Sequence, residues 1–228
     1  MMDEHSDLDL VIAVEEASRD AVMAERFELA RSLGPLLTAF TGEHVGAPRL
    51  LICFYGPPIL HVDLKFVTVD EAAPRVDENR VLFDRGGRLA AALATHEPSY
   101  PQPDLQWIED RIWGWVHYLG GKIARGELFE AIDGLGYIRA RVLGPLILAE
   151  HGAQPNGVRR IESAAPALVG PLRDTVPIHD ARSCRLALDA TIALYRALRA
   201  RAATDALVRR SDAERESIAF LDTLEPSR

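Results

Sequence analysis

The chain has 228 residues, of which 48% are hydrophobic and 26% are charged, and its formal net charge is −8. This composition excludes a disordered or collagen-like chain, and the acidic balance disfavours duplex nucleic acid as a partner. The two cysteines, Cys53 and Cys184, show no metal-type spacing and favour a reduced, cytoplasmic setting. The acidic N-terminus argues against a secretory signal, and every apolar run is far shorter than the ~20 residues that span a bilayer, so we expect no membrane partner.

The first predicted elements are a strand and a helix. Residues 8–14 (LDLVIAV) are rich in branched side chains, which is typical of a strand. Apolar residues at helical spacing then predict a helix that starts at Ser18, is kinked at Gly34-Pro35 and ends by Gly42.

Two further strands are predicted after this helix. Residues 49–55 (RLLICFY) and 59–67 (ILHVDLKFV) flank a Gly-Pro-Pro break, which favours an antiparallel pair. In the second run, apolar residues alternate with His61, Asp63 and Lys65, so these three side chains share one strand face. We interpret Lys65 as a salt-bridge partner of Asp63, with a substrate contact as the alternative. His61 is interpreted as a polar face residue, with tuning of Asp63 as the alternative.

The remainder of the chain predicts a linker and a helical domain. Prolines mark a boundary near residues 97–104, which divides the chain into domains 1–100 and 101–228. The helices are predicted over 104–120, over 123–148 with interruptions at Gly134 and Gly144-Pro145, and over 182–210. The predicted fold class is α+β, with an N-terminal mixed sheet and helix and a C-terminal helical bundle. We expect an active site in the cleft between the two domains.

Three aspartates give the sharpest chemical signal. Asp7 and Asp9 lie at the start of the first predicted strand, and because side chains alternate along a strand they point the same way. Two carboxylates this close repel each other without a cation, and Mg²⁺ prefers oxygen ligands. Asp63 would complete a three-carboxylate cluster if its strand lies beside the first. The alternatives are a solvated edge or helix cap for the pair and a surface position on a two-faced hairpin for Asp63.

The run HSDLDLVIAV, followed by a helix and by ILHVDLKFV, resembles the nucleotidyltransferase fold of the polymerase-beta-like superfamily. It is most similar to the small bacterial aminoglycoside and lincosamide nucleotidyltransferases, which carry Ser-Asp-x-Asp-Leu on one strand and a third aspartate on a later strand. Here those positions are Asp7, Asp9 and Asp63. The resemblance covers the first third of the chain, and the helical remainder is similar in a less specific way.

The resemblance implies an enzyme that transfers a nucleoside monophosphate, usually AMP from ATP or another nucleoside triphosphate, to a hydroxyl of a small molecule such as an antibiotic. Asp7 and Asp9 would bind Mg²⁺, with two ions expected. Asp63 would be the third metal ligand or the base that deprotonates the acceptor hydroxyl. Ser6 would contact the nucleotide.

The family pattern also has a Gly-Ser pair shortly upstream, at the start of a helix whose amides hold the triphosphate. Only Met1 to Ser6 precede Asp7, and they contain no glycine, so we expect that first helix to be missing. Either the sequence begins after the Gly-Ser segment, or the protein has lost this part of its phosphate-binding site. The alternative function is therefore a non-catalytic nucleotidyltransferase-like module that binds a nucleotide or, like an antitoxin, a protein partner.

The helical domain offers further charged candidates. Lys122 follows a Gly-Gly pair, and the resemblance implies a basic residue of this domain over the triphosphate, with a solvated helix start as the alternative. Glu109 is interpreted as a solvated helix carboxylate, with a general base as the alternative. Five arginines indicate a solvated or subunit-contact face, and so allow a homodimer: Arg196, Arg199, Arg201, Arg209 and Arg210.

Overall fold

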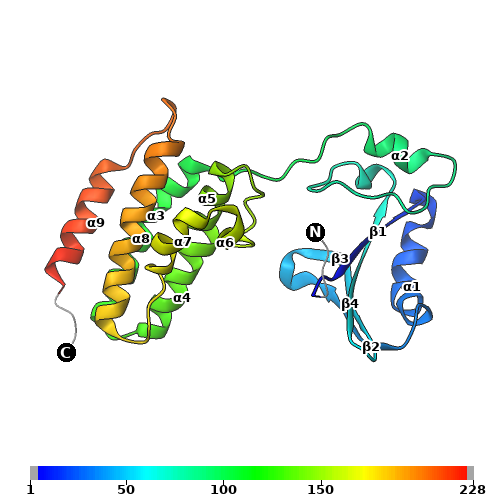
Figure 1. The fold of residues 1–228 in the computed structure, drawn as a ribbon, viewed down its shortest axis with the longest axis horizontal. Helices are drawn as coiled ribbons and strands as arrows, with labels where there is room; N and C mark the ends of the chain where they lie inside the picture. The colour runs from blue at the N-terminus through cyan, green and yellow to red at the C-terminus, as the bar shows by residue number, and fades with distance from the viewer. Residues whose placement is uncertain (1–4, 225–228) are drawn as a thin grey trace. The chain divides into compact units, whose positions relative to one another are not determined.

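The computed structural model describes residues 5–224, and the chain divides into two compact units between Ser99 and Tyr100 (Figure 1). The N-terminal unit contains a sheet and helices, and the regular elements of the described C-terminal unit are all helices. The protein is therefore α+β. Each unit has its own apolar core, and the two are described separately.

The N-terminal unit is built on a four-stranded mixed sheet with the strand order β1-β4-β3-β2. Strand β1 is parallel to β4, and β3 is antiparallel to both β4 and β2. The predicted antiparallel pair is thereby confirmed as β3 and β4. The strands are β1 (Leu8–Val14), β2 (Leu36–Gly42), β3 (Ala47–Tyr55) and β4 (Leu60–Thr68).

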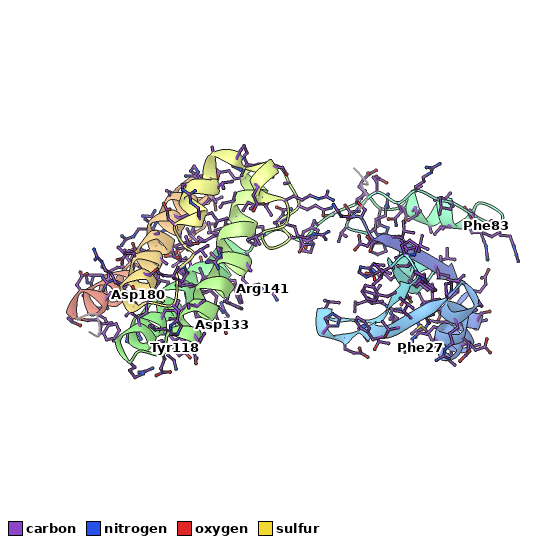
Figure 2. All side chains as sticks on the ribbon, turned by 60° about the horizontal axis from the view of Figure 1, so that its bottom comes forward. Phe27, Phe83, Tyr118, Asp133, Arg141 and Asp180 are labelled. Carbon is purple, nitrogen blue, oxygen red and sulfur yellow. The ribbon has the colours of Figure 1, made fainter. Side chains whose placement is uncertain are left out.

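Helix α1 (Arg19–Ser32) covers one face of this sheet (Figure 1). Apolar side chains of β1, β3 and β4 alternate onto this face and pack against the helix, where Phe27 is labelled in Figure 2. Burial of apolar surface of this kind contributes about 25 cal/mol per Å². The Tyr55 hydroxyl also donates a hydrogen bond to the Ala30 carbonyl oxygen at 2.8 Å. Strand alternation therefore turns the polar residues of β1 and β4 to the face opposite α1.

The prediction of one helix up to Gly42 was wrong. Helix α1 ends at Ser32, and residues 36–42 form strand β2. Pro35 disfavours the helical conformation at the residue before it. Pairing with β3 then satisfies backbone donors and acceptors along that strand. The leucines here are strong helix formers, but this local preference is weak and is overridden by tertiary pairing.

The segment between the sheet and Ser99 is held by side-chain bonds to the backbone. It contains helix α2 (Arg88–Leu93). The partly buried Arg75 guanidinium donates to the carbonyl oxygens of Leu93 at 2.9 Å and His96 at 2.5 Å. Short 3-10 turns complete this unit: η1 (Glu16–Ser18), η2 (Glu43–Val45) and η3 (Asp70–Ala72).

Glu71 connects the end of β4 to β3 and makes a pH-dependent contribution to stability. The Arg49 guanidinium donates to its carboxylate at 2.5 Å, and the Thr68 backbone N–H donates at 2.9 Å. These bonds lower the pKa of Glu71 from its ordinary value of 4.5 to about 2. A lowered pKa stabilises the fold above the ordinary value, and that stabilisation is lost as the pH falls toward 2. We expect Glu71→Gln to give a shallower fall in melting temperature between pH 4.5 and 2 than the wild type.

Thermal unfolding followed by circular dichroism at several pH values checks this. Arg49→Gln serves as the matched variant, because it removes the partner and leaves the carboxylate. It is expected to flatten the same part of the curve. Parallel curves for the wild type and both variants would contradict the role assigned to Glu71.

The C-terminal unit packs its helices around a core of aliphatic side chains with Trp113 and Tyr195. Aspartates cap the two longest helices, since Asp104 accepts from the Trp107 N–H at 2.9 Å and Asp180 accepts from the Ser183 N–H at 2.8 Å. The helices are α3 (Leu105–Ala124), α4 (Leu128–Ile138), α5 (Gly144–Glu150), α6 (Ile161–Ala164), α7 (Val169–Arg173), α8 (Ala181–Ala202) and α9 (Ser211–Thr223). A π-helical turn (Arg139–Leu143) joins α4 to α5, and a 3-10 turn (Pro166–Leu168) precedes α7.

Two glycines that were predicted to end or interrupt helices lie inside continuous helices instead. They allow neighbouring helices to pack closely. Gly120 lies inside α3, where a Cβ atom would collide with the Leu221 side chain of α9. Gly134 lies inside α4, where a Cβ atom would collide with Leu119 of α3. A glycine in a helix costs about 1 kcal/mol relative to alanine. Here that cost is offset by the close approach of neighbouring helices.

The last predicted helix, residues 182–210, is also corrected. Helix α8 ends at Ala202, and a non-helical segment leads to α9, which packs on α3. Gln106 of α3 holds this segment through two hydrogen bonds to the Val208 backbone, at 2.9 and 3.1 Å. These bonds form between residues 102 apart in the chain, so the local composition of the segment could not predict them.

Four of the five arginines predicted as a solvated or subunit-contact face have ion-pair partners within the chain. Arg199 is buried and bonded to Glu109 and Glu214, at 3.0 and 2.8 Å. Arg196 also bonds Glu214, Arg201 bonds Glu150, and Arg210 bonds Asp110. Each of these ion pairs forms within one chain, and the homodimer stays a prediction.

None of the helices in the described part of the chain has the length and apolar character needed to span a bilayer.

Candidate functional site

The sheet register brings the predicted aspartates together. In the parallel pair of β1 and β4, Asp9 is the direct partner of Asp63, so both project from the same face. Asp7 lies two residues before Asp9, immediately ahead of β1. Neighbouring strands are about 4.8 Å apart, which places the carboxylates within reach of one another. The predicted adjacency of the two strands is therefore confirmed, and the aspartates lie on the face opposite α1.

His61 lies between two of these carboxylates. Its Nε2 atom is 2.8 Å from Asp63 Oδ1, and its Nδ1 atom is 3.8 Å from Asp7 Oδ2. The Asp63 side chain is only 15% exposed, whereas that of Asp7 is 43% exposed. A partly buried carboxylate needs a hydrogen-bond partner, and His61 provides one. We call Asp7, Asp9, His61 and Asp63 the carboxylate site.

Aromatic rings extend from the carboxylate site across the sheet. The His61 ring stacks on Phe54 of β3, with centroids 4.7 Å apart and planes at 15°. Phe54 in turn stacks on Phe40 of β2, with centroids 6.4 Å apart. Phe54 and His61 are direct cross-strand partners, so the antiparallel register fixes this contact. The imidazole is thus stacked on Phe54 and hydrogen-bonded to Asp63.

Two other residues of this unit were predicted to take part in the site, Ser6 and Lys65. Ser6 directly precedes Asp7, and its contact with a nucleotide stays a prediction. The predicted salt bridge between Lys65 and Asp63 was wrong, because no such pair is found among residues 5–224 and Asp63 bonds His61 instead. Lys65 is exposed on β4, one alternation beyond Asp63.

Lys122 lies in the last turn of α3, so the helix start given as its alternative was wrong. Its ammonium group is 2.6 Å from Glu127 and 3.5 Å from Glu130, and it lies 5.0 Å from the ring centre of Tyr118 (labelled in Figure 2). The hydrogen bond to Glu127 raises the pKa of Lys122 above its ordinary value. A triphosphate would compete with two carboxylates for this cation, and that contact stays a prediction.

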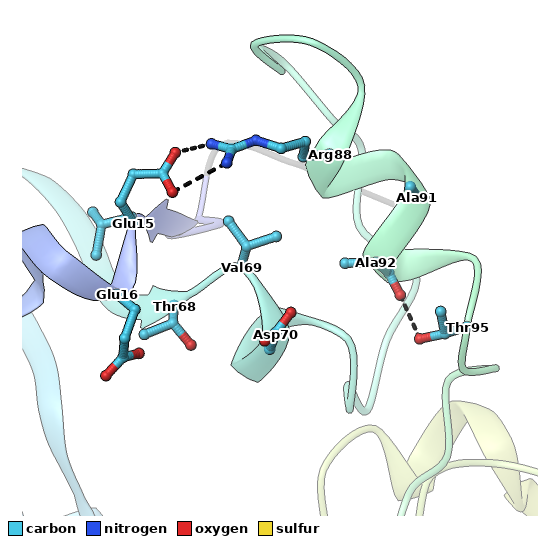
Figure 3. Close-up of a pocket in the computed structure, with 10 residues that line it drawn as sticks. Glu15, Glu16, Thr68, Val69, Asp70, Arg88, Ala91, Ala92 and Thr95 are labelled. Carbon is cyan, nitrogen blue, oxygen red and sulfur yellow. Dashed lines mark hydrogen bonds and ion pairs between the residues drawn. The ribbon is translucent and has the colours of Figure 1, made fainter.

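A cavity of about 740 Å³ lies in the N-terminal unit at the other end of the parallel strands (Figure 3). It adjoins Val14 and Thr68, the last residues of β1 and β4, and Arg88 of α2 forms an ion pair with Glu15 at its rim. Val14 lies five positions after Asp9 in β1, a distance of about 16 Å at the usual rise of a strand. The cavity is therefore distinct from the carboxylate site.

Glu109 shows what sequence reasoning missed in the helical unit. It is fully buried, and its carboxylate accepts hydrogen bonds from Tyr195 at 2.5 Å, from Arg199 and the Arg210 N–H at 3.0 Å each, and from Trp113 at 3.3 Å. Burial alone would raise the pKa of Glu109, but these bonds outweigh burial and hold it below its ordinary value. The interpretation as a solvated carboxylate was therefore wrong, because Glu109 is buried and its oxygens accept hydrogen bonds from within the helical unit.

Within residues 5–224, no three histidine, cysteine, aspartate or glutamate side chains already converge on a point where a metal ion could bind. In the carboxylate site, cation binding therefore requires side chains to turn toward a common point. Turning of exposed side chains between rotamers is fast, on the ps–ns timescale. The backbone register thus places the aspartates side by side, and rotation of their side chains would bring the carboxylates to a common cation.

Comparison with known proteins gives little that bears on function. No protein-family model and no curated protein matches the chain. Among solved structures, an aminoglycoside 6-adenyltransferase from Bacillus subtilis is similar over 95% of this chain and 84% of its own, with 14% sequence identity and a TM-score of 0.38. A TM-score of 0.38 is too low to assign a fold family or an activity.

Proposed function

We propose that the protein is a metal-dependent nucleotidyltransferase that moves AMP from ATP to a hydroxyl of a small molecule, such as a hydroxylated antibiotic. One observation supports this above the others. The parallel register pairs Asp9 with Asp63 on the face opposite α1, and Asp7 is next to them. Three carboxylates on one face are costly to keep together without a cation, and hard divalent ions prefer such ligands.

The carboxylates present are the ligand type that a divalent cation prefers, and their side chains would turn toward a common point to hold it. Asp7, Asp9 and Asp63 would hold it through carboxylate oxygens, as Mg²⁺ prefers. When bound, Mg²⁺ would neutralise negative charge on the phosphate oxygens of the nucleotide and of the leaving pyrophosphate. In its alternative role, Asp63 would not bind the cation but would accept the proton of the acceptor hydroxyl as the hydroxyl oxygen attacks the α-phosphorus. The bond between the α- and β-phosphates then breaks, and pyrophosphate leaves with the electron pair.

We expect Asp9→Asn to weaken Mg-ATP binding at least tenfold, about 1.4 kcal/mol, while the fold persists. The variant keeps the shape of the side chain and removes one negative charge from the metal ligands. Calorimetry measures the affinity, and circular dichroism checks the fold. Asp20→Asn is the matched control, since Asp20 lies exposed on α1, on the other side of the sheet. Equal affinity in the wild type and Asp9→Asn would sink the proposal.

Transfer itself is tested with ATP labelled at either the α- or the γ-phosphate and a panel of hydroxylated cationic small molecules. Nucleotidyl transfer moves the α-label to the acceptor and releases the γ-label in pyrophosphate. Movement of the γ-label would indicate phosphoryl transfer and contradict the proposal. Mg-ATP binding without transfer to any acceptor would favour the non-catalytic nucleotide-binding module.

A further inference from the structure

His61 contacts the carboxylate site in an asymmetric way. Its Nε2 atom is 2.8 Å from Asp63 Oδ1, which is hydrogen-bond distance, whereas its Nδ1 atom is 3.8 Å from Asp7, which is not. An ionised carboxylate can only accept, so the Nε2–H group is the donor to Asp63. One carboxylate oxygen is thus occupied by the imidazole, and the second is left for another partner.

The imidazole is itself held in place. Phe54 stacks on one ring face at 4.7 Å, and the pair is fixed by direct registry between β3 and β4. The His61 side chain is 34% exposed, so roughly two-thirds of it is covered. A histidine ordered in this way fixes the direction of its N–H group, and so the orientation of the carboxylate that receives it.

We propose that His61 is a positioning residue for Asp63: it binds one carboxylate oxygen and so presents the other to a divalent cation. The inference rests on the proposed function, because it assumes that the carboxylate site binds a cation. Hydrogen-bond partners of metal ligands orient those ligands, and their loss typically costs about 10–100-fold in metal affinity. His61 would therefore affect cation affinity through Asp63, without contacting the ion.

The two ring nitrogens allow a matched pair of variants. The side-chain amide of glutamine reaches about as far as Nε2 of histidine, and that of asparagine about as far as Nδ1. His61→Gln therefore keeps an N–H donor within reach of Asp63, and His61→Asn keeps a polar amide without that reach. His61→Leu removes the donor and retains an apolar contact with Phe54.

The test is Mn²⁺ binding to the full chain, measured by electron paramagnetic resonance, with Mn²⁺ as the probe for a divalent cation. We expect His61→Leu and His61→Asn to weaken binding about 10–100-fold and His61→Gln to remain within about threefold of the wild type. Melting temperatures verify folding. If His61→Leu does not fold, the comparison of His61→Gln with His61→Asn still tests the role of His61, because both variants carry a polar amide at the same position.

The outcomes separate this inference from the proposed function. Wild-type affinity in His61→Leu, or equal weakening in the glutamine and asparagine variants, overturns the role of His61 while Asp9→Asn still reports on the site. Absence of Mn²⁺ binding by the wild type overturns both. Rescue by glutamine alone supports positioning through Nε2, since a merely space-filling role would not distinguish the two amides.

Discussion

Replacement of Glu109 by leucine is expected to destabilise the helical unit by about 3 kcal/mol, as measured by chemical denaturation. The variant leaves the guanidinium of Arg199, whose side chain is only 6% exposed, without one of its two carboxylate partners. It also leaves the buried Tyr195 hydroxyl without its acceptor. Breaking a buried ion pair on one side costs about 3–5 kcal/mol, and the lower end is expected because Glu214 stays 2.8 Å from Arg199.

Two variants control this prediction. Asp110→Ala removes the next carboxylate along α3, which forms a more exposed pair with Arg210, and should cost no more than about 1 kcal/mol. The double variant Glu109→Leu with Arg199→Met should recover much of the lost stability, because replacing a buried ion pair by apolar side chains is often close to neutral. A loss for Glu109→Leu no larger than that for Asp110→Ala would show that the buried network does not stabilise the unit.

Gly144→Ala is expected to destabilise the protein by about 3 kcal/mol. Gly144 is buried at the start of α5, where a Cβ atom would lie 2.9 Å from the Gly157 carbonyl carbon and closer still to its oxygen. Backbone atoms cannot rotate away as a side chain can, so helix and loop must separate. This loss exceeds the gain of about 1 kcal/mol that alanine brings to a helix.

Gly114→Ala provides the matched control. Gly114 lies in the middle of α3 on an exposed surface, and a Cβ atom there meets nothing within 4 Å. The same substitution should therefore raise the free energy of unfolding by about 0.5–1 kcal/mol. Urea denaturation of both variants measures whether each substitution lowers or raises the free energy of unfolding. Equal effects of the two substitutions would show that the close approach at Gly144 is relaxed at little cost.

The predicted fold was most accurate where local pattern and tertiary environment agree. The alternation around Asp63 places its strand correctly, because one face of that strand is buried against α1 and the other is not. The prediction was wrong for residues 36–42. Their leucines favour a helix locally, but backbone pairing with β3 makes the segment a strand. The glycines at 120 and 134 also misled it, because a helix tolerates glycine where a neighbouring helix needs the space.

The candidate site was predicted in part. The same-face placement of Asp7 and Asp9 follows from the two-residue period of a strand. Asp63 was expected to join them if its strand lay beside the first, and the register pairs it with Asp9. The contact between His61 and Asp63 had a signal in the sequence, since the two are also separated by two residues. That spacing alone could not distinguish a bonded pair from two solvated side chains.

The sequence by itself determined the strand period, the sign of the charges and the candidate ligands, because these depend on residues close together in the chain. Only the tertiary structure decided that β1 pairs in parallel with β4, that His61 bonds Asp63, and that Glu109 is buried with Arg199. Each of these contacts depends on how distant segments pack or which way a side chain turns. Their free energies arise from desolvation and hydrogen bonding that no local pattern contains.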